Sequence, residues 1–178
     1  MKSLIKQVLK TVLVAIVGVQ VVYAASTPNN GATSVKDSVP VPPPVYIAVV
    51  VNPSNDLSPK LIMQRLHQVF TLRTTLSTAD GSYMVPVDNK DVQVKQAFYH
   101  TVVGWTLDDL SSYWDDQVFS GGKHPLNQLS TQEVIQYVET HPEGIGYVPV
   151  RALYVPNPIS KDKVKVLSVF KVSATSVN

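Results

Sequence analysis

Apolar positions from residue 45 onward follow the period of a strand and the period of a helix in turn. Residues 45–51 form an unbroken run of mostly β-branched residues, which is typical of a strand buried on both faces. The run ends before Pro53, and Ser58 followed by Pro59 then predicts a capped helix start, because proline is favoured at the first helical position. The apolar stripe of this helix consists of Ile62, Leu66, Val69 and Phe70.

Three further helices are expected downstream, each with an apolar stripe at helical spacing. Thr106 with Asp109, and Ser130 with Glu133, have the spacing of a capping box, in which each side chain bonds the other residue's backbone N–H. These boxes predict a helix from Thr106 to about Gln117 and another from Ser130. The three stripes are Val94, Ala97, Phe98 and Val102; Leu107, Leu110 and Trp114, with Trp114 expected against the sheet; and Val134, Ile135 and Val138.

Short strands are expected at residues 83–87, 144–148 and 164–170, where β-branched and aromatic residues gather or alternate with polar ones. Together with residues 45–51 they give four strands among four helices. This alternation predicts an α/β fold, a three-layer sandwich with a largely parallel central sheet.

The N-terminal segment has the three parts of a secretory signal peptide. Lys2, Lys6 and Lys10 give a positive start, residues 12–22 are apolar, and small or tolerated residues lead up to Ala24. We therefore expect a signal peptide over residues 1–24 and a mature protein in the periplasm. An uncleaved anchor is the alternative, but the apolar stretch is shorter than the roughly 20 residues that a spanning helix needs. No membrane insertion is expected after cleavage.

Composition divides the rest of the chain into three segments. Residues 25–44 contain a cluster of prolines and almost no large apolar residue, which predicts a Pro-rich linker acting as a semi-rigid spacer. Residues 45–172 have the composition and length of one globular domain with a single core. Residues 173–178 are expected to be a polar tail.

The charge balance excludes two classes of partner. The chain has 15 Lys+Arg and 13 Asp+Glu residues. The signal peptide carries three of the basic residues and none of the acidic ones, so the mature protein is close to neutral. Nucleic acids and anionic membranes are bound by clustered basic residues, so neither is expected as a partner. Cysteine is absent, which excludes disulfides and thiolate metal sites.

The usual signatures of catalysis and metal binding are missing from the sequence. It has no Gly-x-Ser-x-Gly, no His-Glu-x-x-His and no dinucleotide-binding glycine loop. Gly121-Gly122-Lys123 is similar to a phosphate loop, but His124 follows where Ser or Thr would hold the metal. No two histidines have the i, i+4 spacing of ligands on one helix face. We therefore expect no enzyme, no metal site and no cofactor.

The order of these pieces resembles the phosphate-binding protein family of ABC transporters, and most closely its short, single-lobe relatives. The resemblance covers about residues 45–150, and its most specific part is the Pro-x-Gly-Ile-Gly-Tyr-Val stretch that begins at Pro142. It implies the fold of one lobe of a type 2 periplasmic binding protein. The residues that carry it are Val49 to Ser58, Val69-Phe70, Val85-Pro86-Val87, Ala97-Phe98, Val103-Gly104, Trp114, Phe119, Gly121 and His141 to Val148.

The resemblance also implies where a ligand would bind. In the family, a Ser-Gly-Thr type of loop with an upstream arginine binds the phosphate, and the matching stretch here is residues 88–95. Val92 stands at the serine position, and Asp88 and Asp91 add negative charge there. Free N–H groups at the helix start would attract an anion. The ligand-binding residues implied are Asn52, Ser54, Lys90, Gln93 and Lys95.

Two functions from different classes follow from this reading. The first is a periplasmic solute-binding-like protein that binds a small oxyanion, such as phosphate, or another polar solute. A single lobe cannot enclose such a ligand, so this function would require a homodimer or a protein partner. The alternative is a ligand-free envelope interaction or scaffold protein that kept the fold and docks through one face.

The signal peptide yields the first testable prediction. Protein isolated from its native compartment should begin at Ala25, because cleavage is expected directly after Ala24. Measurement of the intact mass checks this. Retention of Met1 in the exported, folded protein would identify residues 1–24 as an anchor instead.

Overall fold

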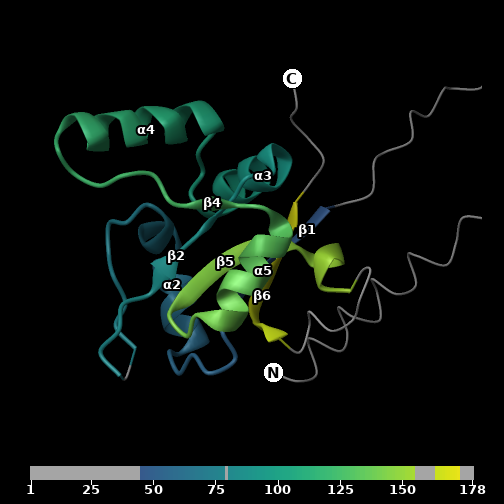
Figure 1. Cartoon of the computed structure of the whole chain (residues 1–178). Helices are drawn as coiled ribbons and strands as arrows, with labels where there is room; N and C mark the ends of the chain where they lie inside the picture. Colours follow the sequence, from purple (N-terminus) through teal and green to yellow (C-terminus); the bar gives the residue numbers. More distant parts are fainter. Residues whose placement is uncertain (1–44, 79, 155–162, 173–178) are drawn as a thin grey trace, which may run out of the picture. The chain divides into compact units, whose positions relative to one another are not determined.

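The computed structural model describes residues 45–78, 80–154 and 163–172, and the predicted signal peptide, linker and polar tail lie outside the described residues. A four-stranded sheet in the order β2-β5-β1-β6 forms the centre of the domain (Figure 1). Its strands are β1 (Val45–Val51), β2 (Val85–Pro86), β5 (Gly144–Pro149) and β6 (Lys165–Val172). No helix in the described part of the chain has the length and apolar character needed to cross a membrane.

Helices cover both faces of the sheet, which confirms the predicted α/β sandwich. Along β1, Ile47, Val49 and Val51 point into a core shared with α2 (Pro59–Phe70) and α3 (Val92–Val102). The intervening Ala48 and Val50 join a second core with α5 (Thr131–Thr140). All five of these β1 residues are fully buried, because a strand with helices on both faces turns every side chain away from water.

The prediction of a largely parallel sheet is wrong. β1 runs antiparallel to both β5 and β6, and only β2 runs parallel to β5. The apolar run of β1 indicates burial on both faces, but that burial arises equally in a central antiparallel strand once helices cover both sides. The pairing of β1 with β6 contains a register shift between Val49 and Val50.

Local capping chemistry sets most helix boundaries. Both predicted capping boxes are formed, Thr106 with Asp109 at the start of α4 (Leu107–Phe119) and Ser130 with Glu133 at the start of α5. Ser58, expected as the cap of α2, makes no side-chain capping bond, and Pro59 instead occupies the first turn. The predicted strand at 83–87 is reduced to the two residues of β2.

A second, two-stranded sheet is present that was not predicted from the sequence. β3 (Asp88–Asn89) pairs in parallel with β4 (Gln128–Leu129). Each strand is two residues long, too short for an apolar period to be detected. Through this pairing, the segment that leads into α3 lies beside the N-terminus of α5.

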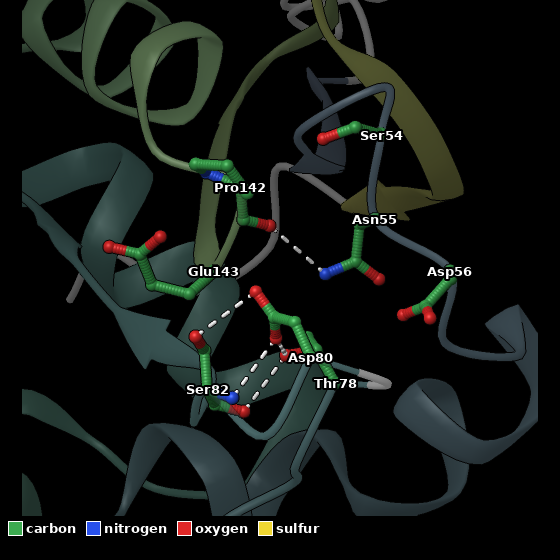
Figure 2. A pocket seen from close by; sticks show the side chains of 8 residues that line it. All are labelled: Ser54, Asn55, Asp56, Thr78, Asp80, Ser82, Pro142 and Glu143. Atoms are coloured by element: carbon green, nitrogen blue, oxygen red, sulfur yellow. Dashed lines mark hydrogen bonds between the residues drawn. The ribbon is translucent and has the colours of Figure 1, made fainter.

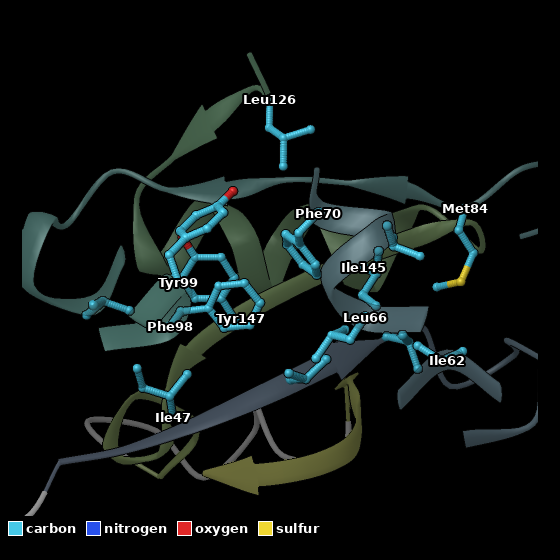
Figure 3. Packing of buried hydrophobic residues seen from close by; sticks show 14 of the residues in the cluster. Ile47, Ile62, Leu66, Phe70, Met84, Phe98, Tyr99, Leu126, Ile145 and Tyr147 are labelled. Carbon is cyan, nitrogen blue, oxygen red and sulfur yellow. The ribbon is translucent and has the colours of Figure 1, made fainter. Parts of the chain in front are cut away.

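Aromatic side chains fill the centre of the larger core. The rings of Phe98 and Tyr147 are stacked, with centroids 3.8 Å apart and an interplanar angle of 4°. Phe70 meets Phe98 edge to face at 4.7 Å, and Tyr99 lies against the same group (Figure 3). Such pairs add to the free energy that burial of the rings already supplies. They tie α2, α3 and β5 together.

Gly146 allows α5 to lie close to the other face of β5. A Cβ atom at this position would stand 2.5 Å from Cγ1 of Val134, closer than two carbon atoms can approach. The glycine in the middle of the strand is therefore required by helix–strand packing, which gives a steric reason for this position of the Gly-Ile-Gly-Tyr-Val stretch.

Trp114 is buried, as expected, but not by packing of its helix on the sheet. α4 packs mainly against α3 and lies apart from the main sheet (Figure 1). Gly104, with a φ of 79°, turns the chain away at the end of α3. The hydroxyl of Tyr113 donates to the carbonyl oxygen of Thr71 at 2.7 Å and attaches α4 to the end of α2.

Substitutions on α4 should therefore have very different costs on its two sides. Trp114→Ala should lower the free energy of unfolding by about 3–5 kcal/mol, because it removes a buried aromatic ring. Phe119→Ala, at a position 96% exposed, should change it by less than about 0.5 kcal/mol. Urea unfolding curves of both variants check this, and equal costs would contradict the orientation of α4.

Candidate functional site

The loop that follows β1 is fixed by Asn52, which is buried. Its side-chain amide donates to the carbonyl oxygens of Val138 and Glu139, both at 2.8 Å. These carbonyls belong to the last turns of α5 and have no partner within the helix. The side-chain oxygen of Asn52 accepts bonds from the backbone N–H and the hydroxyl of Ser54. Asn52 therefore has a structural role, because both its side-chain nitrogen and its side-chain oxygen are hydrogen-bonded within the protein.

A polar cavity of about 270 Å³ opens beside this loop (Figure 2). It is bounded by the loop after β1, the turn before β2 and the corner between α5 and β5. Its lining residues are Ser54, Asn55, Asp56, Thr78, Asp80, Ser82, Pro142 and Glu143. Of the five ligand residues predicted from the sequence, only Ser54 lines this cavity.

Carboxylates dominate the charge of this cavity. Among the described residues, Asp56, Asp80 and Glu143 line it, and no basic side chain does. A hydrogen bond from the Thr78 hydroxyl and another from the backbone N–H of Ser82 lower the pKa of Asp80, so this side chain is ionised at neutral pH. The cavity therefore disfavours an anion and suits hydroxyl groups or a positively charged group.

The N-terminus of α3, where the resemblance implies an anion, is capped by the protein itself. The carboxylate of Asp91 accepts the backbone N–H of Gln93 at 3.0 Å and that of Val94 at 3.3 Å. These N–H groups were expected to be free, and that expectation is wrong. Aspartate is a favoured N-cap because its charge opposes the positive end of the helix dipole. Val92, at the serine position of the family loop, is 62% exposed.

Lys95 is committed to a buried ion pair. Its ammonium nitrogen lies 2.7 Å from Oδ2 of Asp88, whose side chain is almost fully buried. The other oxygen of Asp88 accepts the hydroxyl of Tyr147 at 2.5 Å. Burial, and then the charge of Asp88, hold the pKa of Tyr147 and of Tyr99 well above the ordinary tyrosine value. The carboxylate is thus bonded on both oxygens.

Lys90 forms an exposed ion pair with Glu133, with the charged atoms 3.5 Å apart. The pKa of Glu133 is lowered, mainly by hydrogen bonds from the side chain and the backbone of Ser130 and then by the charge of Lys90. Gln93 is exposed on the first turn of α3. Neither lysine of the predicted site therefore lacks a carboxylate partner.

The predicted ligand residues fall into two groups at opposite ends of α5. Asn52 bonds the C-terminal end of this helix, whereas Lys90 pairs with its first turn through Glu133. A ten-residue helix is about 15 Å long. The structure brings Lys90, Gln93 and Lys95 to the start of α3, and Asn52 and Ser54 together, but it does not join the two groups.

Three residues of the cavity were not predicted from the sequence as ligand-binding residues. Asp56, Asp80 and Glu143 come from three separate loops, and no spacing within the sequence relates them. The polar Thr78-x-Asp80-x-Ser82 stretch does indicate a turn, but its approach to Glu143 depends on β2 pairing with β5. No group of three or more His, Cys, Asp or Glu residues suited to a metal ion occurs within residues 45–78, 80–154 and 163–172.

No protein-family model matches the sequence, and no curated protein matches it. Among solved structures, the chain is similar to a candidate phosphate ABC transporter substrate-binding protein with bound phosphate from Clostridium perfringens, at 18% identity and a TM-score of 0.43. It is also similar, at 11% identity and a TM-score of 0.47, to an ABC-type phosphate transport receptor from Vibrio cholerae. A candidate phosphate-binding protein from Planctomyces limnophilus gives the same two values.

These matches cover 69% of this chain and 40–45% of the matched chains, so the chain spans less than half the length of those proteins. The three matched proteins are of the kind that the sequence resembles, the phosphate-binding proteins of transporters. At this identity the likeness concerns the fold alone, and the chemistry of the site is given by the residues of this chain.

The buried tyrosines yield a prediction for alkaline pH. Tyr147 and Tyr99 stay protonated in the folded protein as the pH passes the ordinary value of 10.0, while the unfolded chain releases these protons. The stability that the two protonated tyrosines contribute to the folded state is therefore complete below pH 10 and is lost as the pH rises above it. The free energy of unfolding should thus fall as the pH rises past about 10.

The variant Tyr147→Phe isolates one of the two groups. It should start from a lower stability, because the hydrogen bond to Asp88 is lost, but it should lose less stability between about pH 9 and 11 than the wild type. Urea unfolding at a series of pH values checks this. Equal slopes in the two proteins would show that Tyr147 titrates normally.

Proposed function

We propose that this protein is a non-enzymatic interaction module of the cell envelope, built on a single α/β lobe of periplasmic-binding-protein type. The proposal follows the alternative reading of the sequence, in which the fold is kept and the oxyanion ligand is lost. The predicted signal peptide would deliver the domain to the periplasm, and the Pro-rich linker before it would set its reach.

One observation carries this proposal: the carboxylates of the protein occupy the interactions that an anion would need at the start of α3. Asp91 accepts the N–H groups of Gln93 and Val94. Asp88 takes the ammonium group of Lys95. An incoming anion would have to displace a cap and expose a buried charge, and breaking a buried ion pair is strongly unfavourable.

Solute capture is a second candidate, and the polar cavity beside Ser54 is the observation that favours it. Its volume of about 270 Å³ is sufficient for a small molecule. The carboxylates of Asp56, Asp80 and Glu143 favour a solute that carries hydroxyl groups or a positive charge. An oxyanion such as phosphate is therefore the least suited ligand for this cavity.

Calorimetric titration distinguishes interaction from anion capture. Phosphate and sulfate, added to about 10 mM, should give no saturable heat with the wild-type protein. The variant Val92→Ser, which places a hydroxyl at the family's serine position, should give none either, because Asp91 still occupies the adjacent N–H groups. Val169→Ser, at an exposed position on β6, serves as the matched control. Saturable binding of either anion by the wild type would overturn the proposal.

A further inference from the structure

The buried charge of Asp88 lies among donors that would suit a bound anion. Asp88 belongs to β3, and its side chain is almost fully buried. One carboxylate oxygen contacts the ammonium group of Lys95 at 2.7 Å, and the other accepts the hydroxyl of Tyr147 at 2.5 Å. Hydrogen bonds to an ionised acceptor are shorter and stronger than neutral ones. A small free anion in the same place would have the same partners.

The hydroxyl of Tyr147 is held in position by more than Asp88. Its oxygen accepts the backbone N–H of Asn89 at 3.3 Å, which leaves its proton for the carboxylate of Asp88. The side-chain amide of Asn89 in turn donates to the carbonyl oxygen of Tyr147 and to the hydroxyl of Thr131 at the start of α5. Contacts between β3, β5 and α5 therefore orient this donor toward the place that Asp88 occupies.

A third donor, Tyr99, lies near the carboxylate and has no acceptor. Tyr99 is one turn beyond Lys95 on α3, is fully buried, and has its ring at right angles to that of Tyr147 (Figure 3). The charge of Asp88 is close enough to raise the pKa of Tyr99 further, after burial, yet no atom of the described residues accepts a hydrogen bond from the Tyr99 hydroxyl. Such a buried hydroxyl is costly and rare. The donors around Asp88 thus exceed those that its carboxylate uses, which an ion pair alone does not require.

We propose that Asp88 is a tethered ligand: its carboxylate fills an anion site formed by Lys95, Tyr147 and Tyr99 and excludes free anions from it in the wild-type protein. This inference rests on the proposed function, in which the oxyanion ligand is lost, and names the residue responsible at this site. Because the carboxylate is part of the chain, it binds without the loss of translational freedom that a free anion would undergo. A free anion can therefore occupy the site only where this side chain is absent.

The space that Asp88 occupies determines the class of anion. Substitution by glycine would vacate the volume of a carboxylate and a methylene group. Formate has the same planar, singly charged group, so it should fit between the same donors. Phosphate and sulfate are tetrahedral and larger, and the close packing of a protein interior would not admit them. The site should thus take small carboxylates and reject the oxyanions that the family fold implies.

Thermal unfolding of Asp88→Gly in sodium formate tests the site. This variant should melt below the wild type, because Lys95 is left without its buried counterion. Formate up to about 100 mM should raise its melting temperature along a saturation curve, as expected of a ligand that binds only the folded state. The shift of the wild type in the same salt is subtracted, which removes general salt effects. Calorimetric titration of formate should give saturable heat with Asp88→Gly, with a Kd below about 20 mM, and none with the wild type.

Two variants distinguish a vacated anion site from loss of the buried charge. Asp88→Asn removes the same charge, but its amide still fills the site, so formate should shift its melting temperature no more than that of the wild type. In Asp88→Gly with Lys95→Met the cation is absent too, and the response to formate should disappear. If Asp88→Gly alone is unfolded in plain buffer, formate should restore its near-ultraviolet circular dichroism, and the double variant shows whether the glycine itself permits folding.

Tyr99 provides a measurement that a purely structural ion pair would not affect. In Asp88→Gly, the added substitution Tyr99→Phe should weaken formate binding at least about threefold, because a free anion can move toward this hydroxyl. In the wild type, Tyr99→Phe should leave the melting temperature unchanged or raise it, since the hydroxyl has no acceptor among the described residues there. An ion pair between Asp88 and Lys95 alone predicts no dependence of formate binding on Tyr99.

The outcomes separate this inference from the proposed function. A formate response of Asp88→Gly no larger than that of Asp88→Asn, or one that Tyr99→Phe leaves unchanged, would overturn the tethered-ligand site. Either result would leave the proposed function in place as long as the wild type gives no saturable heat with phosphate or sulfate. Saturable phosphate binding by the wild type would overturn that function, whatever the response of the variants to formate.

Discussion

A buried carboxylate fixes the centre of the domain. Asp88 lies on β3, accepts the hydroxyl of Tyr147 from β5 and pairs with Lys95 from α3, so three elements meet at one charge. A buried charge is tolerated only where it is paired and hydrogen-bonded, which makes the relative positions of these elements hard to change. The stacking of Phe98 on Tyr147 extends the constraint into the apolar core.

This constraint also bears on function. Because Asp88 and Asp91 satisfy the start of α3 from within the chain, stability and anion binding would compete for the same lysine and the same N–H groups. The interaction function that we propose does not use these groups, so the competition does not arise.

The sequence predicts features that depend on neighbours in the chain. The capping boxes at Thr106 and Ser130 are local, and both form as expected. Strand direction depends on contacts between distant segments. The apolar run of β1 is compatible with parallel and with antiparallel pairing, so the sequence does not distinguish the two. The placement of the predicted ligand residues also depends on distant segments: Asn52 and Lys90 lie at opposite ends of α5 because of contacts that no local pattern encodes.

The register shift between β1 and β6 has a consequence for aggregation through the edge of the sheet. Within the described residues β6 is the last strand of the sheet, and an open strand of eight residues is a template for aggregation. The irregularity opposite Val49 and Val50 increases the local twist, and Lys165 and Lys171 place charge near both ends of β6. The bulge and the two lysines together make β6 a poor seed for cross-β growth.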